Sequence, residues 1–357
     1  MLQRAALAIE RDAPIAQAGV RPYRVDDEPA VLDVLTRSLR RWTNCPDPAA
    51  LWRWKHFANP FGSSCVLVHE TPEHDIAGVV ALMFWNLRRG GRILRCERTT
   101  DLATHPAHRR QGIASSFWGP ARKKVIDAGV ALVFHTPNRT SLSFTRRSTR
   151  PVFEMRPRFG IRNSARVLSA LMPFAPRRSP DERLEPRELF RRPAMSAAML
   201  LERRDALAEL LTHDAVRRGA RLQTARTPEY IEWRYAAHPT IQYYAVCIES
   251  GSRLDGCAIF RVDRLGVARR LVVQELLFRP GADRVPRAIA EELDALVDCD
   301  LVQYFDAEGP WRDLLPGLPL PTWNAHSFTI GVDDQTLGRS PLDADSWSLS
   351  LGDLQEI

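Results

Sequence analysis

The sequence predicts an α/β protein of the α+β type, built from two similar units in tandem. Its 357 residues are enough for two domains of roughly 150 residues each. Hydrophobic residues make up 45% of the chain and charged residues 26%, as in globular proteins, which excludes a mostly disordered chain. Trp54 and Trp233, 179 positions apart, each precede a basic residue and then a ring-bearing residue, and Pro60 and Pro239 follow them at the same distance.

The similarity extends along both halves of the chain. Gly78 and Gly256 each open an apolar strand, and Pro106 and Pro280 each follow a later strand, with the offset drifting from 179 to 174 positions as loop insertions would produce. We interpret the chain as an internal duplication. The expected divisions are an N-terminal arm at 1–19, a first domain at 20–160, a partly packed connection at 161–196 and a second domain at 197–357. The alternative is two independent domains on a flexible tether.

Alternation and helical periodicity predict the elements of the first unit in order. The helix expected at 28–42 places Val31, Leu35 and Leu39 on one face. A Gly-Gly pair at 90–91 marks a hairpin, and Pro120 should kink the helix in which it lies. The expected strands are 20–25, 64–69, 76–87, 93–104 and 130–135, and the expected helices are 28–42, 48–57 and 112–128.

The second unit repeats this order. We expect helices at 205–218, 228–235 and 286–297, and a strand at 301–305. The tail at 347–353 alternates polar and apolar residues, which predicts a final edge strand.

Charge and cysteine content limit the possible partners. Residues 1–200 carry 33 basic and 18 acidic side chains, whereas residues 201–357 carry 17 and 25, so the first half can attract an anionic ligand and the two halves can attract each other. Nucleic acid is disfavoured as a partner because no zinc finger, RNA-binding sheet motif or lysine-rich tail is present. The six cysteines include no Cys-x-x-Cys pair, which indicates reduced thiols in a cytoplasmic protein and no metal site. The apolar stretch at 76–85 is too short to span a membrane.

The chemistry is concentrated between residues 101 and 114. A strand ends, a polar loop turns, and a helix begins at Gly112. The start of a helix presents unpaired N–H groups and a positive dipole, which suit a pyrophosphate. Gly112 and Ala114 are small enough to let phosphate oxygens approach the backbone, and Arg109 and Arg110 add positive charge.

This segment resembles the GNAT superfamily of acyl-CoA-dependent N-acyltransferases. Arg109-x-x-Gly112-x-Ala114 is similar to the pyrophosphate loop of that family, and the opening at 21–28 and Thr136-Pro137-Asn138 are similar to its first strand and to the loop after its fifth. The resemblance covers most of residues 20–150 and implies two tandem GNAT-like domains, each a mixed, mostly antiparallel sheet flanked by helices. It also implies an acyl-CoA co-substrate, acetyl-CoA or another acyl-CoA, held by Ala103, Thr104, Arg109, Arg110, Gln111, Gly112, Ile113, Ala114 and Asn138. The second unit lacks this loop after Pro280.

Acyl transfer to an amine requires a base that removes a proton from the amine. Glu97 and Asp101 lie four residues apart on the strand that leads into the loop, and we expect both on one face of the sheet. Either can serve as the base, and His105 is a weaker candidate. The family often has a tyrosine acid at the position of Thr145 in this chain.

These features predict an enzyme that moves an acetyl group from acetyl-CoA to a primary amine of a small molecule by direct attack in a ternary complex. One alternative is a Fem-type aminoacyl transferase, which also has tandem copies. The other is a non-catalytic protein that binds or senses acyl-CoA.

Overall fold

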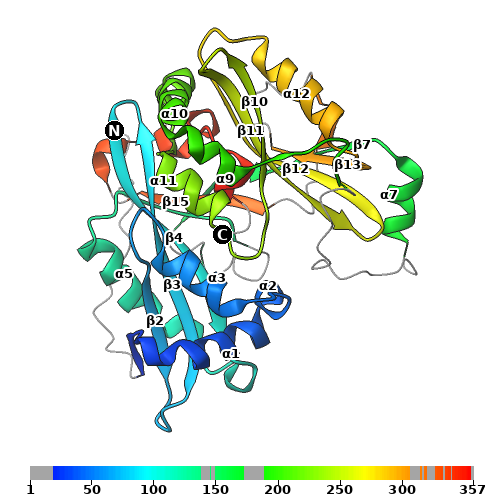
Figure 1. Cartoon of the computed structure of the whole chain (residues 1–357). Helices are drawn as coiled ribbons and strands as arrows, with labels where there is room; N and C mark the ends of the chain where they lie inside the picture. Colours follow the sequence, from blue (N-terminus) through cyan, green and yellow to red (C-terminus); the bar gives the residue numbers. More distant parts are fainter. Residues whose placement is uncertain are drawn as a thin grey trace, which may run out of the picture.

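The computed structural model describes residues 19–137, 145, 149–172, 189–305, 314–315, 317–319, 326–332, 334–338 and 340–354. Within the described residues, the first part of the chain forms six strands and five helices before the second sheet begins (Figure 1). These elements are β1 (Val20–Pro22), α1 (Glu28–Ser38), α2 (Arg40–Thr43), α3 (Pro48–Phe57), β2 (Cys65–Glu70), β3 (Ile76–Arg89), β4 (Arg92–Thr104), α4 (Ile113–Ser116), α5 (Trp118–Asp127), β5 (Leu132–His135) and β6 (Arg150–Met155).

The remaining elements begin with a short strand at the end of the predicted first domain and a helix in the predicted connection. Its elements are β7 (Arg158–Ile161), α7 (Ser164–Leu171), β8 (Met195–Ser196), α9 (Ala197–Leu200), α10 (Arg204–Arg218), β9 (Gln223–Thr224), α11 (Pro228–Ile231) with a π-helical turn (Glu232–Ala236), β10 (Tyr244–Ser250), β11 (Arg253–Leu265), β12 (Ala268–Phe278), α12 (Val285–Leu296), β13 (Leu301–Tyr304), β14 (Leu318–Pro319), β15 (His326–Val332) and α13 (Leu351–Leu354).

Local sequence explains the predicted elements that the structure contains. Asp47 caps α3 by accepting a hydrogen bond from the N–H of Ala50, and Pro48 occupies the first turn, so α3 has the predicted bounds. The helix predicted at 112–128 is divided at Phe117 into α4 and α5. This break lies one turn before Pro120, whose ring cannot fit against the carbonyl of the preceding turn of a continuous helix.

The strands form two sheets with matching order. The first sheet runs β1-β2-β3-β4-β5-β15-β6, with β9 added beside β3, and the second runs β8-β10-β11-β12-β13-β7-β14. In each sheet a single parallel pair, β4 with β5 or β12 with β13, interrupts an antiparallel arrangement. The fold is therefore α/β with two mixed, mostly antiparallel sheets flanked by helices, as predicted.

Each sheet contains an internal strand from the other part of the chain, in addition to the short β9 beside β3. β15 lies between β5 and β6 of the first sheet, while β7 lies between β13 and β14 of the second. In Figure 1 β7, coloured green, lies beside β13 among the yellow and orange strands of the second sheet. This exchange joins the two sheets through backbone hydrogen bonds as well as through side-chain packing.

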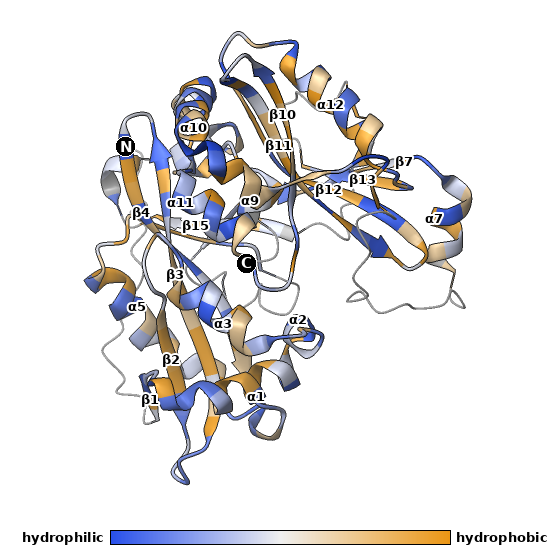
Figure 2. Ribbon diagram, viewed as in Figure 1, coloured by the Kyte–Doolittle hydropathy of each residue, from blue (hydrophilic) through white to orange (hydrophobic). Residues whose placement is uncertain are grey.

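One large core is shared between the two sheets, and a smaller core lies on the outer face of each. The shared core combines side chains from α1–α3 with others from α9–α11 and from the facing strands. Helices α4 and α5 cover the outer face of the first sheet, and α12 covers the outer face of the second. Apolar residues follow the interior strands and one face of α12 (Figure 2).

The two units meet through a reciprocal pair of tryptophans at the centre of the shared core. The rings of Trp54 and Trp233 stack with centroids 4.9 Å apart. The indole N–H of Trp54 donates to the carbonyl of Trp233 at 2.7 Å, and the indole N–H of Trp233 donates to the carbonyl of Trp54 at 2.9 Å. Contacts of i with j and of j with i are the signature of a two-fold relation, so a pseudo-two-fold axis passes between these rings.

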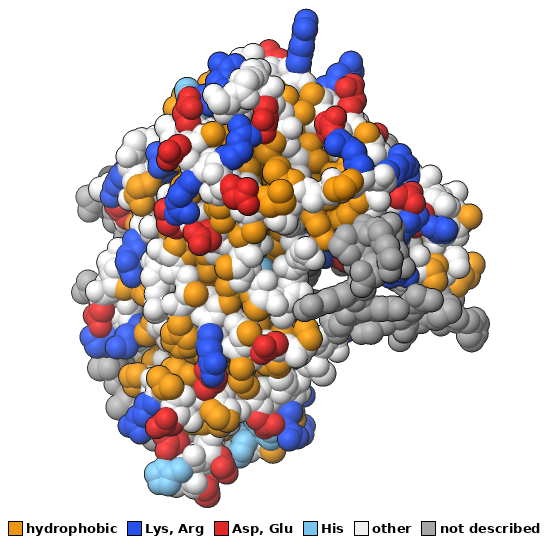
Figure 3. Space-filling view, viewed as in Figure 1, with side chains coloured by type: hydrophobic (Ala, Val, Ile, Leu, Met, Phe, Trp, Pro, Cys, Tyr) orange, Lys and Arg blue, Asp and Glu red, His pale blue; other side chains and the backbone are white. Residues whose placement is uncertain are grey.

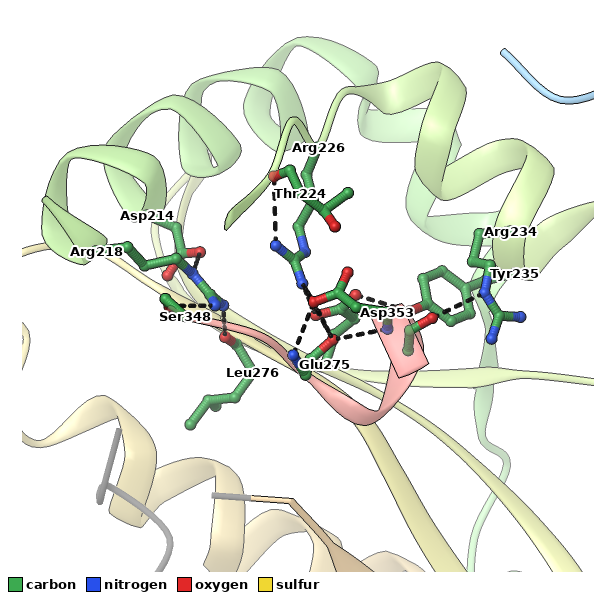
Figure 4. Close-up of polar contacts among 12 residues, drawn as sticks. Asp214, Arg218, Thr224, Arg226, Arg234, Tyr235, Glu275, Leu276, Ser348 and Asp353 are labelled. Carbon is green, nitrogen blue, oxygen red and sulfur yellow. Dashed lines mark hydrogen bonds and ion pairs between the residues drawn. The ribbon is translucent and has the colours of Figure 1, made fainter. Parts of the chain in front are cut away.

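The tail does not form the predicted edge strand. Trp347 makes a single bridge with Leu222, and the chain then enters α13. Figure 4 shows how the tail is held: Arg226 lies between the carboxylates of Glu275 and Asp353, at 3.0 and 2.7 Å. One buried guanidinium bridges two buried carboxylates here, which fixes the tail against β12 instead of extending a sheet.

Acidic and basic side chains are interspersed on the face shown in Figure 3. The excess of arginine in the first half therefore does not gather into one basic patch on this face.

Candidate functional site

Strand β4 carries the predicted site and is paired differently on its two sides. It pairs with β3 along most of its length, but within the described residues it pairs with β5 only at Cys96 and Glu97. Beyond Glu97 the two parallel strands separate. The β5-facing edge of β4 is therefore open towards Thr104, and Glu97 lies at the point where the opening begins.

A β-bulge lies within the open part of β4. Thr100 faces Ala81 and Ala103 faces Val79, so two residues of β4 lie opposite the single residue between them on β3. Asp101, within the bulge, has a φ of 52°. An extra residue inverts the alternation of side chains along a strand.

The bulge places Glu97 and Asp101 on opposite faces of the sheet. Glu97 lies between Phe84 and Val133, which belong to the outer face under α5. Asp101 contacts helices on the inner face, described below. The prediction that both carboxylates share a face is wrong, because it assumed an unbroken strand.

Glu97 is a buried carboxyl group with one hydrogen-bond donor recorded. Its side chain is 1% exposed, and the Thr99 hydroxyl donates to its Oε1 at 2.9 Å. Burial raises the pKa of Glu97 to about 8, and the hydrogen bond from Thr99 opposes this shift. A carboxyl group with such a pKa can exchange a proton with an amine near neutral pH.

Asp101 is the centre of a buried ionic cluster. Its carboxylate accepts from Lys55 Nζ at 2.5 Å, His56 Nε2 at 3.0 Å and Trp42 Nε1 at 2.9 Å. Burial alone would raise the pKa of Asp101, but the Lys55 charge and the His56 hydrogen bond hold it below its usual range. Burial also lowers the pKa of Lys55 to about 7. Three donors on one carboxylate leave it poorly suited to take a proton from an amine.

Sequence reasoning did not assign Lys55, His56 and Trp42 to this cluster. The available signal was the repeated pattern around Trp54, which places Lys55 and His56 directly after it. In the second unit Tyr235 occupies the position of His56, and its hydroxyl donates to Glu275 at 2.8 Å. Both units therefore use the residue two positions after the repeated tryptophan to hold an acidic residue of the fourth strand.

The loop after β4 presents backbone amides. His105 begins a short 3-10 turn, Pro106–His108, and its ring accepts from the N–H of Ala107 at 3.3 Å. Arg110 and Gly112 have φ values of 63° and 79°, which turn the chain sharply before α4. Within the described residues no hydrogen bond is recorded for the N–H groups of Arg109, Arg110, Gln111 and Gly112.

Gly112 is required by this turn. At this positive φ, a residue with a side chain would destabilise the fold by about 1–2 kcal/mol relative to glycine. A Cβ atom at this position would have no neighbour within 4 Å, so the space beside the glycine is open. Ile113 and Ala114 begin α4 immediately after it.

The remaining predicted donor-binding residues are placed as follows. Ala103 and Thr104 end β4, and the carbonyl of Thr104 accepts from the hydroxyl of Ser38 at 2.9 Å. Asn138 lies outside the described residues. Thr145 is buried, and its carbonyl accepts from the Thr149 hydroxyl at 2.9 Å.

The second sheet has the same opening but not the same side chains. Gly78 faces Thr104 and Gly256 faces Phe278, so the two ladders can be aligned position by position. In that alignment Leu271 occupies the place of Glu97, because it faces Val262 and Val302 as Glu97 faces Phe84 and Val133. No carboxylate is present at this position of the second unit.

The described residues show neither a metal-binding group nor a helix suited to cross a membrane. The described residues contain no group of three His, Cys, Asp or Glu side chains able to hold a metal ion. Across the same ranges, none of the helices has the length and apolar character that a membrane crossing demands.

Comparison with known proteins agrees with this geometry. Residues 19–148 match the family model for an acetyltransferase (GNAT) domain, and no curated protein matches the chain. A probable N-acyltransferase of Enterococcus faecalis is 14% identical, with a TM-score of 0.58 over 89% of this chain and 73% of that one. A GCN5-related N-acetyltransferase of Anabaena variabilis is 13% identical, with a TM-score of 0.58 over 87% of this chain and 71% of that one.

A third similar structure is an N-myristoyltransferase of Saccharomyces cerevisiae with bound myristoyl-CoA. It is 10% identical, with a TM-score of 0.54 over 91% of this chain and 85% of that one. At these identities the structures establish a shared fold, and the family model identifies the domain that carries β4 and its loop. Residues 19–148 of this chain therefore carry an acetyltransferase (GNAT) domain.

Proposed function

We propose that this chain transfers an acyl group, most simply acetyl, from acyl-CoA to a primary amine of a small molecule. The observation that carries the proposal is the open edge of β4, which has an acid–base group at its start and a loop of unpartnered amides at its end. The amine attacks the thioester directly while both substrates are bound.

The donor lies along β4 and over the loop. Amide groups of the pantetheine arm pair with the open edge of β4 near Ala103 and Thr104, as an added strand would. The N–H groups from Arg109 to Ala114 hold the pyrophosphate, and the side chains of Arg109 and Arg110 add charge. Asn138 contacts the pantetheine arm.

Glu97 is the general base in this proposal. It lies where β4 and β5 separate, so a thioester held between the strands comes close to its carboxyl group. The pKa of about 8 is close to neutral, which favours proton transfer from the amine. Asp101 instead positions the bulge through Lys55 and His56. The departing thiolate is a tolerable leaving group, so the absence of a tyrosine at Thr145 does not prevent the reaction.

The second unit is a degenerate copy that binds no donor. Leu271 replaces the base, and the loop after Pro280 lacks the Arg-x-x-Gly-x-Ala pattern. The matching strand orders and the reciprocal tryptophans support a duplication with domains at 20–160 and 197–357 and a connection between them. Each chain then binds one acyl-CoA, and the second unit forms a wall of the acceptor site.

Calorimetric titration with acetyl-CoA tests this proposal. The wild-type protein should bind one equivalent, and Gly112→Glu should abolish binding by placing a negative charge where the pyrophosphate lies. Gly281→Glu is the matched control: Gly281 follows β12 in the second unit, has a φ of 73° and also has open space beside it. The Gly281→Glu variant adds the same negative charge as Gly112→Glu and places a side chain at a similar positive φ.

Comparing the two variants shows whether a loss of acetyl-CoA binding comes from the loop at Gly112 or from any added charge at a positive-φ glycine. Unchanged affinity in Gly112→Glu would refute the donor site, as would equal losses in both variants. Binding of two equivalents would refute the degenerate role of the second unit. Acetyl-, butyryl- and myristoyl-CoA should be compared, because the similar structures include both acetyl- and myristoyltransferases.

A further inference from the structure

A cavity of about 550 Å³ lies where the two units and the tail meet. Its walls include the rings of Phe153, Phe305 and Trp347 and the side chain of Leu349, with Arg221 and Asp345 as its charged residues. Cavities of this size with mainly apolar walls and few polar groups are typical of small-molecule sites. None of the described residues proposed above to bind the donor lines it.

The cavity lies on the inner side of the first sheet, opposite α5. Phe153 on β6 stacks on Phe328 of β15 with ring centroids 4.8 Å apart, and Phe328 lies 5.9 Å from the ring of Phe134 on β5. The guanidinium of Arg98, next to Glu97 on β4, lies 5.9 Å from the same Phe134 ring. Two rings, Phe328 and Phe134, therefore lie between the cavity wall at Phe153 and Arg98 beside the β4–β5 opening.

The position of the cavity suits an acceptor rather than the donor. The loop at 109–114 leads into α4, whose first residue packs in the outer core, so the proposed pyrophosphate site lies on the outer side. Phe153 and Trp347 pack with the shared inner core. An acceptor in the cavity would approach the opening from the side opposite to the donor, so its amine must pass between β4 and β5 to reach Glu97, which faces the outer side.

Arg221 gives the cavity a specific chemistry. Its Nε donates to the carbonyl of Arg218 at 3.2 Å, and no ion pair is recorded for it among the described residues. Neighbouring Arg217 and Arg218 both pair with Asp214. A guanidinium without a carboxylate partner beside aromatic walls is suited to a planar anion on a flat apolar body.

We propose that this cavity binds the body of the acceptor: an aromatic or flat apolar group that carries a carboxylate or a phosphate, held by Arg221. The assignment to an acceptor rests on the proposed function. The ligand class does not, because it follows from the cavity itself and is tested without acyl-CoA. Asp345 is exposed at the rim and repels the anion weakly. Removing its charge should therefore affect anion binding in the opposite direction to removing the charge of Arg221.

Fluorine NMR titration of the full chain tests the ligand class. The probes are 4-(trifluoromethyl)phenylacetate, 4-(trifluoromethyl)phenyl phosphate and uncharged 4-(trifluoromethyl)benzyl alcohol. At least one anionic probe should bind about tenfold or more tightly than the alcohol, as a charged hydrogen bond provides. Comparing the two anions shows whether the site prefers a carboxylate or a phosphate.

Five variants locate the binding. Arg221→Gln should remove the preference for an anion and Arg221→Lys should keep part of it. Asp345→Asn should leave affinity unchanged or raise it, and Arg192→Gln, which alters a distant exposed ion pair with Glu292, should have no effect. Ala344→Trp should block all three probes by filling the cavity while removing no core side chain, which keeps the test usable if Arg221→Gln does not fold.

The proposal is wrong if no anionic probe binds at millimolar concentration or if Arg221→Gln binds as wild type does. It is also wrong if Asp345→Asn, rather than Arg221→Gln, weakens binding, because Arg221 would then not be the group that recognises the anion. Acetyl-CoA titration of the same samples gives an independent readout: normal donor binding with no probe binding refutes the acceptor cavity alone.

Discussion

Replacing Glu97 with glutamine should stabilise the folded protein at neutral and higher pH. Burial raises the pKa of the Glu97 carboxyl from 4.5 to about 8. The folded state then binds this proton more tightly than the unfolded chain does, so the carboxyl costs no stability below about pH 4.5. The cost grows as pH rises to about 8 and is constant above it. At about 1.4 kcal/mol per pH unit, the carboxyl costs about 3 kcal/mol at pH 7.

Urea unfolding of the wild type and Glu97→Gln at pH 5, 7 and 9 measures this cost. Glutamine keeps the shape of the side chain and an oxygen that can accept from Thr99. The variant should be about as stable as the wild type at pH 5, about 3 kcal/mol more stable at pH 7 and more so at pH 9. Glu154→Gln changes a half-exposed carboxylate and should follow the wild-type curve. Parallel pH curves for the wild type and Glu97→Gln would show that Glu97 is ionised in the folded protein and would refute the reasoning.

Other variants test the catalytic and architectural interpretations. Glu97→Gln should slow acyl transfer by about 100-fold or more, and the wild-type kcat/KM should rise with pH towards about 8; an unchanged pH–rate profile would place the base elsewhere. Asp101→Asn should destabilise the protein by about 3–5 kcal/mol by leaving Lys55 buried without its partner, and adding Lys55→Met should recover part of that loss in urea unfolding; full stability in the single variant would contradict the buried pair. A fragment of residues 1–195 lacks β15 and with it the fully buried side chain of Phe328, so it should show no cooperative thermal transition by circular dichroism until residues 197–357 are added; independent folding of the fragment would contradict the exchange.

The sequence was most informative where local chemistry decides the structure. Helix α3 has its predicted bounds because its cap and its proline both lie within the segment. The turn at Gly112 follows from one residue that tolerates positive φ. The repeated glycines also mark real equivalences: a Cβ on Gly78 would meet Ile113, and one on Gly256 would meet Val285, each the first residue of the helix that follows the fourth strand.

Long-range features could not be predicted in this way. The bulge at Asp101 exists only in relation to β3, so the sequence of β4 alone suggested regular alternation and a wrong face for one carboxylate. The tail also alternates as a strand would, but the buried charges of Arg226 and Glu275 hold it in another conformation. The exchange of β7 and β15 depends on pairing between residues that are distant in sequence.

That exchange sets an order of events during synthesis. The edge of β5 at His135 is completed by Thr329, which the ribosome adds nearly two hundred residues later. At roughly 5–20 residues per second, the nascent first sheet waits about 10–40 s for its missing strand. During that interval the neighbouring edges of β5 and β6 are open to pairing with other chains. Chaperone demand should therefore peak before residue 332 is made, and slowing translation of the second half should increase aggregation of the first.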